Sequence, residues 1–102
     1  MNRREIILQE IENNPNNPLN YYFLAIEERS IGNLETSIEM LKNIIDKFPE
    51  YQPSYYTIAE LLYELDRTEE GTFFAKKGIL IANKLHLTKV VNELESLILI
   101  ND

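Results

Sequence analysis

The sequence of 102 residues contains no cysteine and no tryptophan, and it has only three glycines, four prolines and one histidine. Without cysteine the chain forms no disulfide, carries no thiolate nucleophile and offers no cysteine ligand to a metal. Basic residues are also scarce, since ten lysines and arginines stand against seventeen acids and give a net charge of −7. Such a charge repels phosphate backbones and anionic lipid headgroups. We therefore expect no nucleic acid and no membrane among the partners.

Long apolar runs are missing as well. The run Ile6–Leu8 near the N-terminus ends at Gln9, which is too short for a secretory signal segment. Elsewhere the longest run is Leu97–Ile100, far below the roughly 20 residues that span a bilayer. The composition, 44% hydrophobic and 26% charged, is typical of a folded protein. We expect a single folded domain over residues 1–102 with a cytoplasmic location.

No pattern of catalytic or metal-binding residues is found. The single histidine, His86, stands beside a predicted turn, and no serine lies in a nucleophile motif. The adjacent acids Glu27 and Glu28 point about 100° apart on a helix, so they do not form a carboxylate dyad. We therefore expect no enzyme activity, no metal site and no cofactor. A rival hypothesis is an enzyme of unknown kind, which turnover abolished by His86→Ala would support.

Apolar residues recur at spacings of three and four along the chain, which predicts six helices and no strand. Asn17 followed by Pro18 predicts the N-cap and the first position of the second helix. Gly32 is expected to end that helix in a left-handed conformation, and Asn33 to cap the next helix. Thr88 is expected to cap the last helix. The predicted helices cover residues 3–13, 18–31, 34–48, 53–65, 69–84 and 89–100.

Residues 18–51 are repeated 34 residues later in the sequence. Tyr21 returns as Tyr55 and Ala25 as Ala59, and Pro49 closes the first copy. In this period and these positions the chain resembles the tetratricopeptide repeat family, whose unit is a 34-residue pair of antiparallel helices. The resemblance implies an all-α fold in which the hairpins stack as a short right-handed superhelical array of about six helices. Its parts would be an N-terminal capping helix (1–14), two repeats (18–51 and 52–84) and a C-terminal capping helix (88–100).

Two glycines lie inside the fifth predicted helix. Because a glycine there costs about 1 kcal/mol relative to alanine, Gly71 and Gly78 predict close contact with a neighbouring helix. Ile44, the counterpart of Gly78 in the first repeat, occupies a position that the family usually keeps small.

The resemblance also implies a concave groove that binds an extended or helical peptide. The family positions that line it correspond here to Tyr22, Ile26, Arg29, Tyr56, Glu60 and Tyr63. Tyrosine and arginine are frequent interface anchors. The alternative is that Tyr22 and Tyr56 only pack between neighbouring helices. The carboxylate-clamp type of ligand, a chaperone tail, is not expected, because Thr57 and other unsuitable residues replace the basic and asparagine residues of the clamp.

The function expected from the sequence is therefore a non-catalytic module that binds a protein or a peptide. The main rival is a structural protein that forms a homodimer or larger homo-oligomer through its last helix. Leu99 and Ile100 are expected to be exposed there, and exposed apolar patches favour association with a partner or a second copy.

Overall fold

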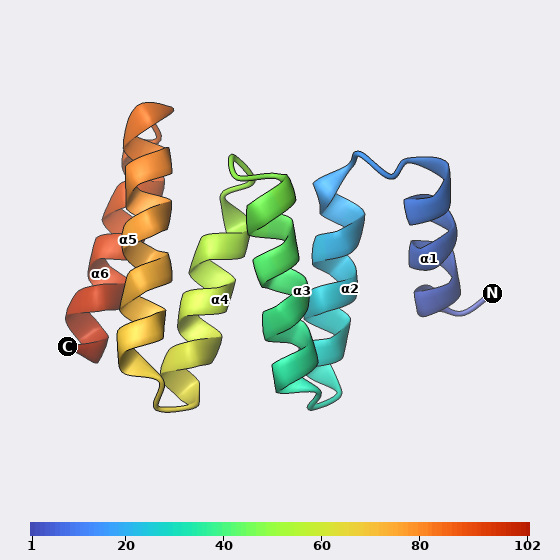
Figure 1. Ribbon diagram of the computed structural model, residues 1–102, viewed down its shortest axis with the longest axis horizontal. Helices are drawn as coiled ribbons and strands as arrows, with labels where there is room; N and C mark the ends of the chain where they lie inside the picture. The colour runs from blue at the N-terminus through green and yellow to red at the C-terminus, as the bar shows by residue number, and fades with distance from the viewer. The chain divides into compact units, whose positions relative to one another are not determined.

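The computed structural model describes residues 1–102, which form six α-helices and no strand (Figure 1). The helices are α1 Arg3–Asn13, α2 Pro18–Ser30, α3 Leu34–Lys47, α4 Pro53–Glu64, α5 Thr68–Lys84 and α6 Thr88–Asn101. All six predicted helices are confirmed, because each observed boundary lies within one residue of the expected one. None of the helices combines the length and apolar character that a membrane span requires.

The chain divides into two compact units, residues Met1–Phe48 and Pro49–Asp102, which we call the N-terminal and C-terminal units. In the N-terminal unit α2 contacts both α1 and α3 (Figure 1). Helix α3 has a clear apolar stripe of buried residues, namely Ile38, Leu41, Ile44 and Ile45. The close pairing of α2 with α3 is supported by small side chains, since the Ser37 hydroxyl donates a 2.7 Å hydrogen bond to the Ala25 carbonyl.

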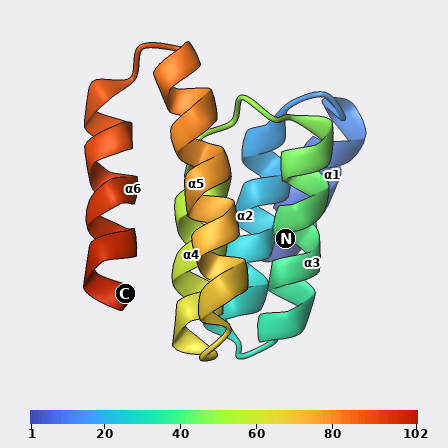
Figure 2. The same ribbon diagram turned by 60° about the vertical axis from the view of Figure 1, so that its left-hand side comes forward.

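In the C-terminal unit α5 contacts both α4 and α6 (Figure 2). Helix α6 also contacts α4. The three helices share one apolar core. Its buried members are Ala59, Tyr63, Ala75, Leu94 and Leu97, and Ile79, Val90 and Ile98 pack against them. This core therefore depends on side chains from all three helices.

The two glycines of α5 lie where neighbouring side chains approach the helix backbone. A Cβ atom on Gly78 would stand 2.6 Å from Tyr55 Cβ and 2.9 Å from Leu94 Cδ1. A Cβ atom on Gly71 would stand 2.9 Å from ring carbons of Tyr63. The predicted close contacts at both glycines are confirmed.

Three of the inter-helix turns share one geometry. Each contains a residue with positive φ, namely Gly32 at 88°, Asp66 at 58° and His86 at 59°. In each turn the next N–H donates to the carbonyl five residues earlier, as in a Schellman motif. These bonds are Asn33 to Glu28 at 2.9 Å, Arg67 to Leu62 at 2.9 Å and Leu87 to Ala82 at 2.8 Å. The left-handed role predicted for Gly32 is thus confirmed, and an aspartate and a histidine take the same role elsewhere.

The predicted N-caps of α2 and α3 have different outcomes. Asn17 caps α2 as expected, because its side chain accepts a 3.1 Å hydrogen bond from the Leu19 N–H. Asn33 occupies the N-cap position of α3, but its side chain makes no cap hydrogen bond. Its amide instead donates to the Glu28 carboxylate at 2.8 Å. The predicted position of Asn33 is confirmed, but its side chain forms no capping hydrogen bond because a nearly buried carboxylate takes it.

The cap predicted for the last helix is wrong. Leu87 occupies the N-cap position of α6, and Thr88 is the first helical residue. The Val91 N–H donates to the Leu87 carbonyl at 3.0 Å, so the helical pattern starts one residue earlier than expected. The compact turn at His86 leads directly into the helix and leaves Thr88 inside it.

Candidate functional site

The three groove residues predicted in the N-terminal unit lie along α2. Tyr22, Ile26 and Arg29 are spaced by four and three residues, so they follow one face of the helix. All three are half-buried. Each therefore retains side-chain surface while it also packs within the protein.

The three groove residues predicted in the C-terminal unit lie along α4 at the same spacing. Tyr56 is 37% exposed and Glu60 is half-buried, whereas Tyr63 is only 8% exposed. The Tyr63 hydroxyl shares a 2.7 Å hydrogen bond with Thr72 Oγ1, and its ring packs against Gly71. Tyr63 is thus a core residue of this unit. That the six side chains of α2 and α4 line one groove stays a prediction.

A second pair of tyrosines has a structural role. The Tyr21 hydroxyl donates to the Pro15 carbonyl at 2.8 Å, and the Tyr55 hydroxyl donates to the Pro49 carbonyl at 2.5 Å. Each bond joins the first helix of a hairpin to the proline-containing turn before it. Tyr22 and its counterpart Tyr56, one residue further along, have more accessible surface than the fully buried Tyr55.

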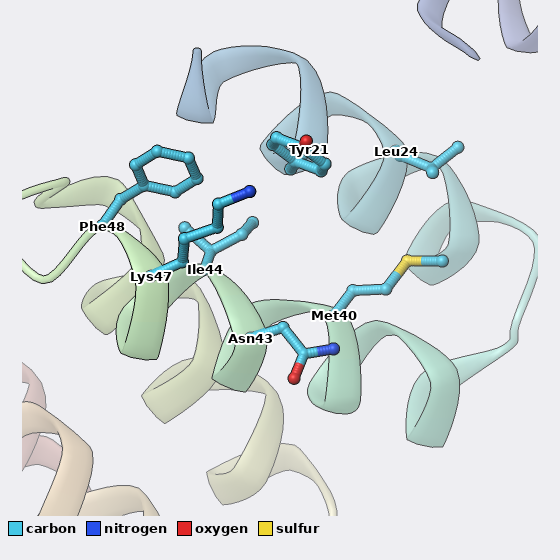
Figure 3. Close-up of a pocket in the computed structure, with 7 residues that line it drawn as sticks. All are labelled: Tyr21, Leu24, Met40, Asn43, Ile44, Lys47 and Phe48. Atoms are coloured by element: carbon cyan, nitrogen blue, oxygen red, sulfur yellow. The ribbon is translucent and has the colours of Figure 1, made fainter. Parts of the chain in front are cut away.

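A pocket of about 180 Å³ opens between α2 and α3 in the N-terminal unit (Figure 3). Its lining residues are Tyr21 and Leu24 from α2, and Met40, Asn43, Ile44, Lys47 and Phe48 from α3 and its C-cap. Most of the lining is therefore carbon or sulfur. The polar side-chain groups are the Tyr21 hydroxyl, which is already bonded to Pro15, the Asn43 amide and the Lys47 ammonium.

The ammonium group of Lys47 is held over two aromatic rings. Its Nζ atom lies 5.5 Å from the ring centroid of Tyr21 and 5.5 Å from that of Phe48 (Figure 3). Both distances are within the range of cation–π attraction. The two rings are 5.9 Å apart and tilted by 33°. Lys47 forms no ion pair with a carboxylate of the chain, so its charge remains available at the pocket.

This pocket was not predicted from the sequence. Its lining combines residues from the apolar stripes of α2 and α3 with polar residues of α3, so no single motif marks it. One signal was present in the repeat itself, since Met40 is replaced by Phe74 at the same position of the second repeat. A difference in side-chain size at one position of the repeat indicates that side chains fill the space between the two helices differently in the two hairpins.

A buried carboxylate ties α1 to the first hairpin. Glu28 is 4% exposed and accepts hydrogen bonds from Arg4 Nη1 at 2.6 Å and from Asn33 Nδ2 at 2.8 Å. The bond from Asn33 and then that from Arg4 lower the pKa of the Glu28 carboxyl below its ordinary value, against the opposite effect of burial. Both bonds stay within the N-terminal unit, so we assign this cluster a structural role.

Several large apolar side chains are exposed on the C-terminal unit. Leu99 is 76% exposed and Ile100 is 78% exposed on α6, as the sequence predicted, while Leu97 is buried. On α5, Phe73 is 60% exposed and Leu80 is 72% exposed. These residues offer surface for association without forming a cavity.

His86 is exposed in the turn between α5 and α6, where its positive φ serves the turn geometry. No group of three or more histidine, aspartate or glutamate side chains is placed to hold a metal ion.

Comparison with known proteins identifies the fold. No protein-family model and no curated protein matches the sequence. A solution NMR structure of a tetratricopeptide repeat domain protein from Salinibacter ruber superposes with a TM-score of 0.82 at 26% identity, over 86% of this chain and 89% of that one. A crystal structure of a tetratricopeptide repeat domain protein from the same organism gives a TM-score of 0.77 at 26% identity, over 83% and 96%. The chain thus has the all-α fold of a small tetratricopeptide repeat domain.

Proposed function

We propose that this protein is a non-catalytic adaptor that binds a peptide or a segment of another protein in a groove lined by its tyrosines. The groove residues are those predicted from the repeat: Tyr22, Ile26, Arg29, Tyr56 and Glu60, with Tyr63 supporting them from the core. The adaptor needs no cofactor. A cytoplasmic location stays a prediction of the sequence.

One observation carries the proposal. Two tyrosines at the same repeat position, Tyr22 and Tyr56, keep accessible surface, although each follows a tyrosine bonded to a proline carbonyl. A large amphipathic side chain that is partly exposed at equivalent positions is a suitable anchor for a partner, because it brings apolar area and a hydroxyl group at little entropic cost. The tetratricopeptide repeat fold is generally a scaffold for protein interactions, which supports the same conclusion.

The net charge supports a protein partner over a nucleic acid. At −7 the chain repels phosphate backbones on average. Arg29, Tyr22 and Tyr56 are residue types that are enriched in protein interfaces. A peptide with apolar or aromatic anchors and polar groups between them fits these side chains best.

The test is affinity capture from the native lysate with wild-type protein and with the double variant Tyr22→Ala, Tyr56→Ala. We expect the wild type to retain a partner that the double variant loses, while the circular dichroism of the variant stays helical. Tyr56→Ala alone is the second variant, because this side chain is 37% exposed and its loss disturbs packing least. Phe73→Ala is the matched control, since it removes another exposed ring, on α5. Equal capture by wild type and the folded double variant would contradict the proposal.

A second candidate function is homo-oligomerisation through α6. The observation that favours it is the exposure of two consecutive apolar residues, Leu99 at 76% and Ile100 at 78%. Light scattering over a dilution series distinguishes the two functions. A monomer at every accessible concentration would exclude the oligomer, whereas a dimer that is lost in Leu99→Ser, Ile100→Ser would favour it.

A further inference from the structure

We propose that the pocket between α2 and α3 of the N-terminal unit is a second binding site, and that it takes an acidic protein segment. The segment has a leucine-sized side chain followed directly by an aspartate or a glutamate. The apolar side chain enters the pocket, and the carboxylate pairs with Lys47 at its edge (Figure 3). This site is separate from the tyrosine groove, because none of the six groove residues lines it.

The size and lining of the pocket define the apolar part of the ligand. At about 180 Å³ it is smaller than the roughly 300–1,000 Å³ of pockets that enclose whole small molecules. It has room for one aliphatic side chain. Leu24, Met40 and Ile44 provide apolar walls, and the flexible thioether of Met40 can adapt to the shape that enters.

Lys47 defines the charged part of the ligand. Its ammonium lies over the Tyr21 and Phe48 rings and has no carboxylate partner in the chain. A charge that is oriented beforehand and unpaired favours an anionic group on the ligand. Because the protein as a whole has a net charge of −7, an acidic segment is repelled by most of the surface. The affinity of the acidic segment for the protein should therefore depend mainly on the charge of Lys47.

The second repeat explains why a single site of this kind is expected. The counterparts of Tyr21 and Leu24 are Tyr55 and Ile58, and both are fully buried. Phe74 stands in place of Met40. The two side chains that α4 contributes at these positions are thus covered, and Ile81 stands in place of Lys47, so the C-terminal unit has no lysine at this position to pair with a carboxylate.

The experiment uses three capped tetrapeptides as probes: acetyl-Gly-Leu-Asp-Gly-amide, the same peptide with Asn for Asp, and the same peptide with Ala for Leu. Binding is followed by NMR titration of the methyl resonances of Met40 and Ile44 in the full chain. One side chain and one exposed ion pair give affinities on the order of millimolar. We expect the Leu-Asp peptide to shift both residues, the Leu-Asn peptide to bind about three- to fivefold more weakly, and the Ala-Asp peptide to cause no shift.

Protein variants assign the effect to the pocket. Met40→Phe introduces the residue of the second repeat and should abolish the peptide-induced shift of the Ile44 methyl resonances, which remain as the probe in this variant. Lys47→Gln should remove the preference for Asp over Asn. Lys42→Gln should leave that preference unchanged, because Lys42 is a half-buried lysine of the same helix that pairs with Glu39 at 3.7 Å and does not line the pocket. Lys47 is exposed, so its replacement by glutamine disturbs no core packing. This variant therefore tests the inference even if Met40→Phe fails to fold.

Three results would overturn the inference. One is equal binding of the Asp and Asn peptides to the wild type, and another is undiminished binding to folded Met40→Phe. The third is a change in the Met40 and Ile44 resonances on dilution without peptide, which would mean that a second copy of the chain occupies the pocket. The double variant Tyr22→Ala, Tyr56→Ala should bind the Leu-Asp peptide normally, so failure of the tyrosine groove and failure of this pocket are distinguishable.

Discussion

The two units contain the same helical hairpin and differ in where a third helix is added. In the N-terminal unit α1 packs on α2, the first helix of the hairpin, whereas in the C-terminal unit α6 packs on α5, the second helix. Gly78 allows Leu94 of α6 to lie close to Tyr55, which is fully buried. The counterpart of Gly78 is Ile44, and Tyr21 stays half-buried beside an open pocket.

This difference shows that the same repeat can form a closed core in one unit and leave an open pocket in the other. The backbone turn, the tyrosine-to-proline hydrogen bond and the small residue on the first helix are common to both hairpins. The side chains on the second helix decide how closely a further helix can approach. In the C-terminal unit they favour a closed core, and in the N-terminal unit they leave accessible apolar surface.

The largest effect is expected from closing the space at Gly78. Gly78→Ala would place a methyl group 2.6 Å from Tyr55 Cβ and 2.9 Å from Leu94 Cδ1. Because a separation of 2.6 Å from a Cβ atom forces a backbone or helix shift, we expect a cost toward the upper end of the range of about 1–3 kcal/mol for overpacking. That cost exceeds the gain of about 1 kcal/mol in helix propensity. We expect a lower free energy of unfolding in urea and faster hydrogen exchange in α6.

Gly71→Ala is the comparison variant for this prediction. A methyl group there meets the edge of the Tyr63 ring at 2.9 Å and the Ala59 carbonyl oxygen at 3.2 Å. Both contacts are longer than the 2.6 Å to the Cβ atom of Tyr55, so the loss of stability should be smaller. Unchanged or increased stability of Gly78→Ala would show that the close approach of α6 is not what requires glycine.

An intermediate effect is expected at Ser37, whose counterpart in the second repeat is Gly71. The Ser37 hydroxyl is fully buried and donates to the Ala25 carbonyl at 2.7 Å. Ser37→Ala should lower the free energy of unfolding by about 1 kcal/mol through loss of this bond. Ser30→Ala is the control, because its hydroxyl donates to the Glu27 carbonyl at 2.7 Å in an exposed position. Similar losses in urea unfolding for both variants would argue against a special role of the buried bond.

The smallest effect is expected at Glu28, where the second repeat has the buried Leu62. The pKa of Glu28 is lowered in the folded protein, so its contribution to stability is present above the ordinary value of 4.5 and is lost as pH falls through the folded pKa. Urea unfolding of wild type and Glu28→Gln should differ most near neutral pH and converge in acid. Arg4 is 42% exposed, and solvent screening keeps the difference small.

Glu27→Gln is the control for the pH series. Its carboxylate lies 3.8 Å from the same Arg4 Nη1 atom, which is too long for a hydrogen bond. A pH profile of Glu28→Gln that runs parallel to the wild-type profile would show that the Glu28 carboxylate does not contribute as described.

The positions of the helices could be predicted from the sequence because the residue patterns that specify them are local. Apolar spacing, Asn17 before Pro18 and Gly32 after α2 each act within a few residues. The partner of the Asn33 side chain could not be predicted in this way, because its amide donates to Glu28 in a cluster that also needs Arg4 from another helix. Competition between hydrogen-bond partners is decided by tertiary contacts.

The candidate sites were only partly accessible from the sequence for the same reason. Repeat position selects Tyr56 and Tyr63 alike, but Tyr63 turns into the core where Gly71 leaves room for its ring. The pocket depends on the fit between α2 and α3, in particular on Met40 where the second repeat has Phe74. Such volumes follow from how helices pack, and spacing along one helix does not reveal them.

The measurement that tests the adaptor function most directly is photo-cross-linking from the tyrosine positions in the native lysate. A photoreactive phenylalanine analogue is placed singly at Tyr22, at Tyr56 and, as an exposed aromatic control, at Phe73. The proposed function predicts that positions 22 and 56 cross-link to the same segment of one partner protein and that position 73 does not. Cross-links from position 73 alone, or to different proteins from positions 22 and 56, would contradict it.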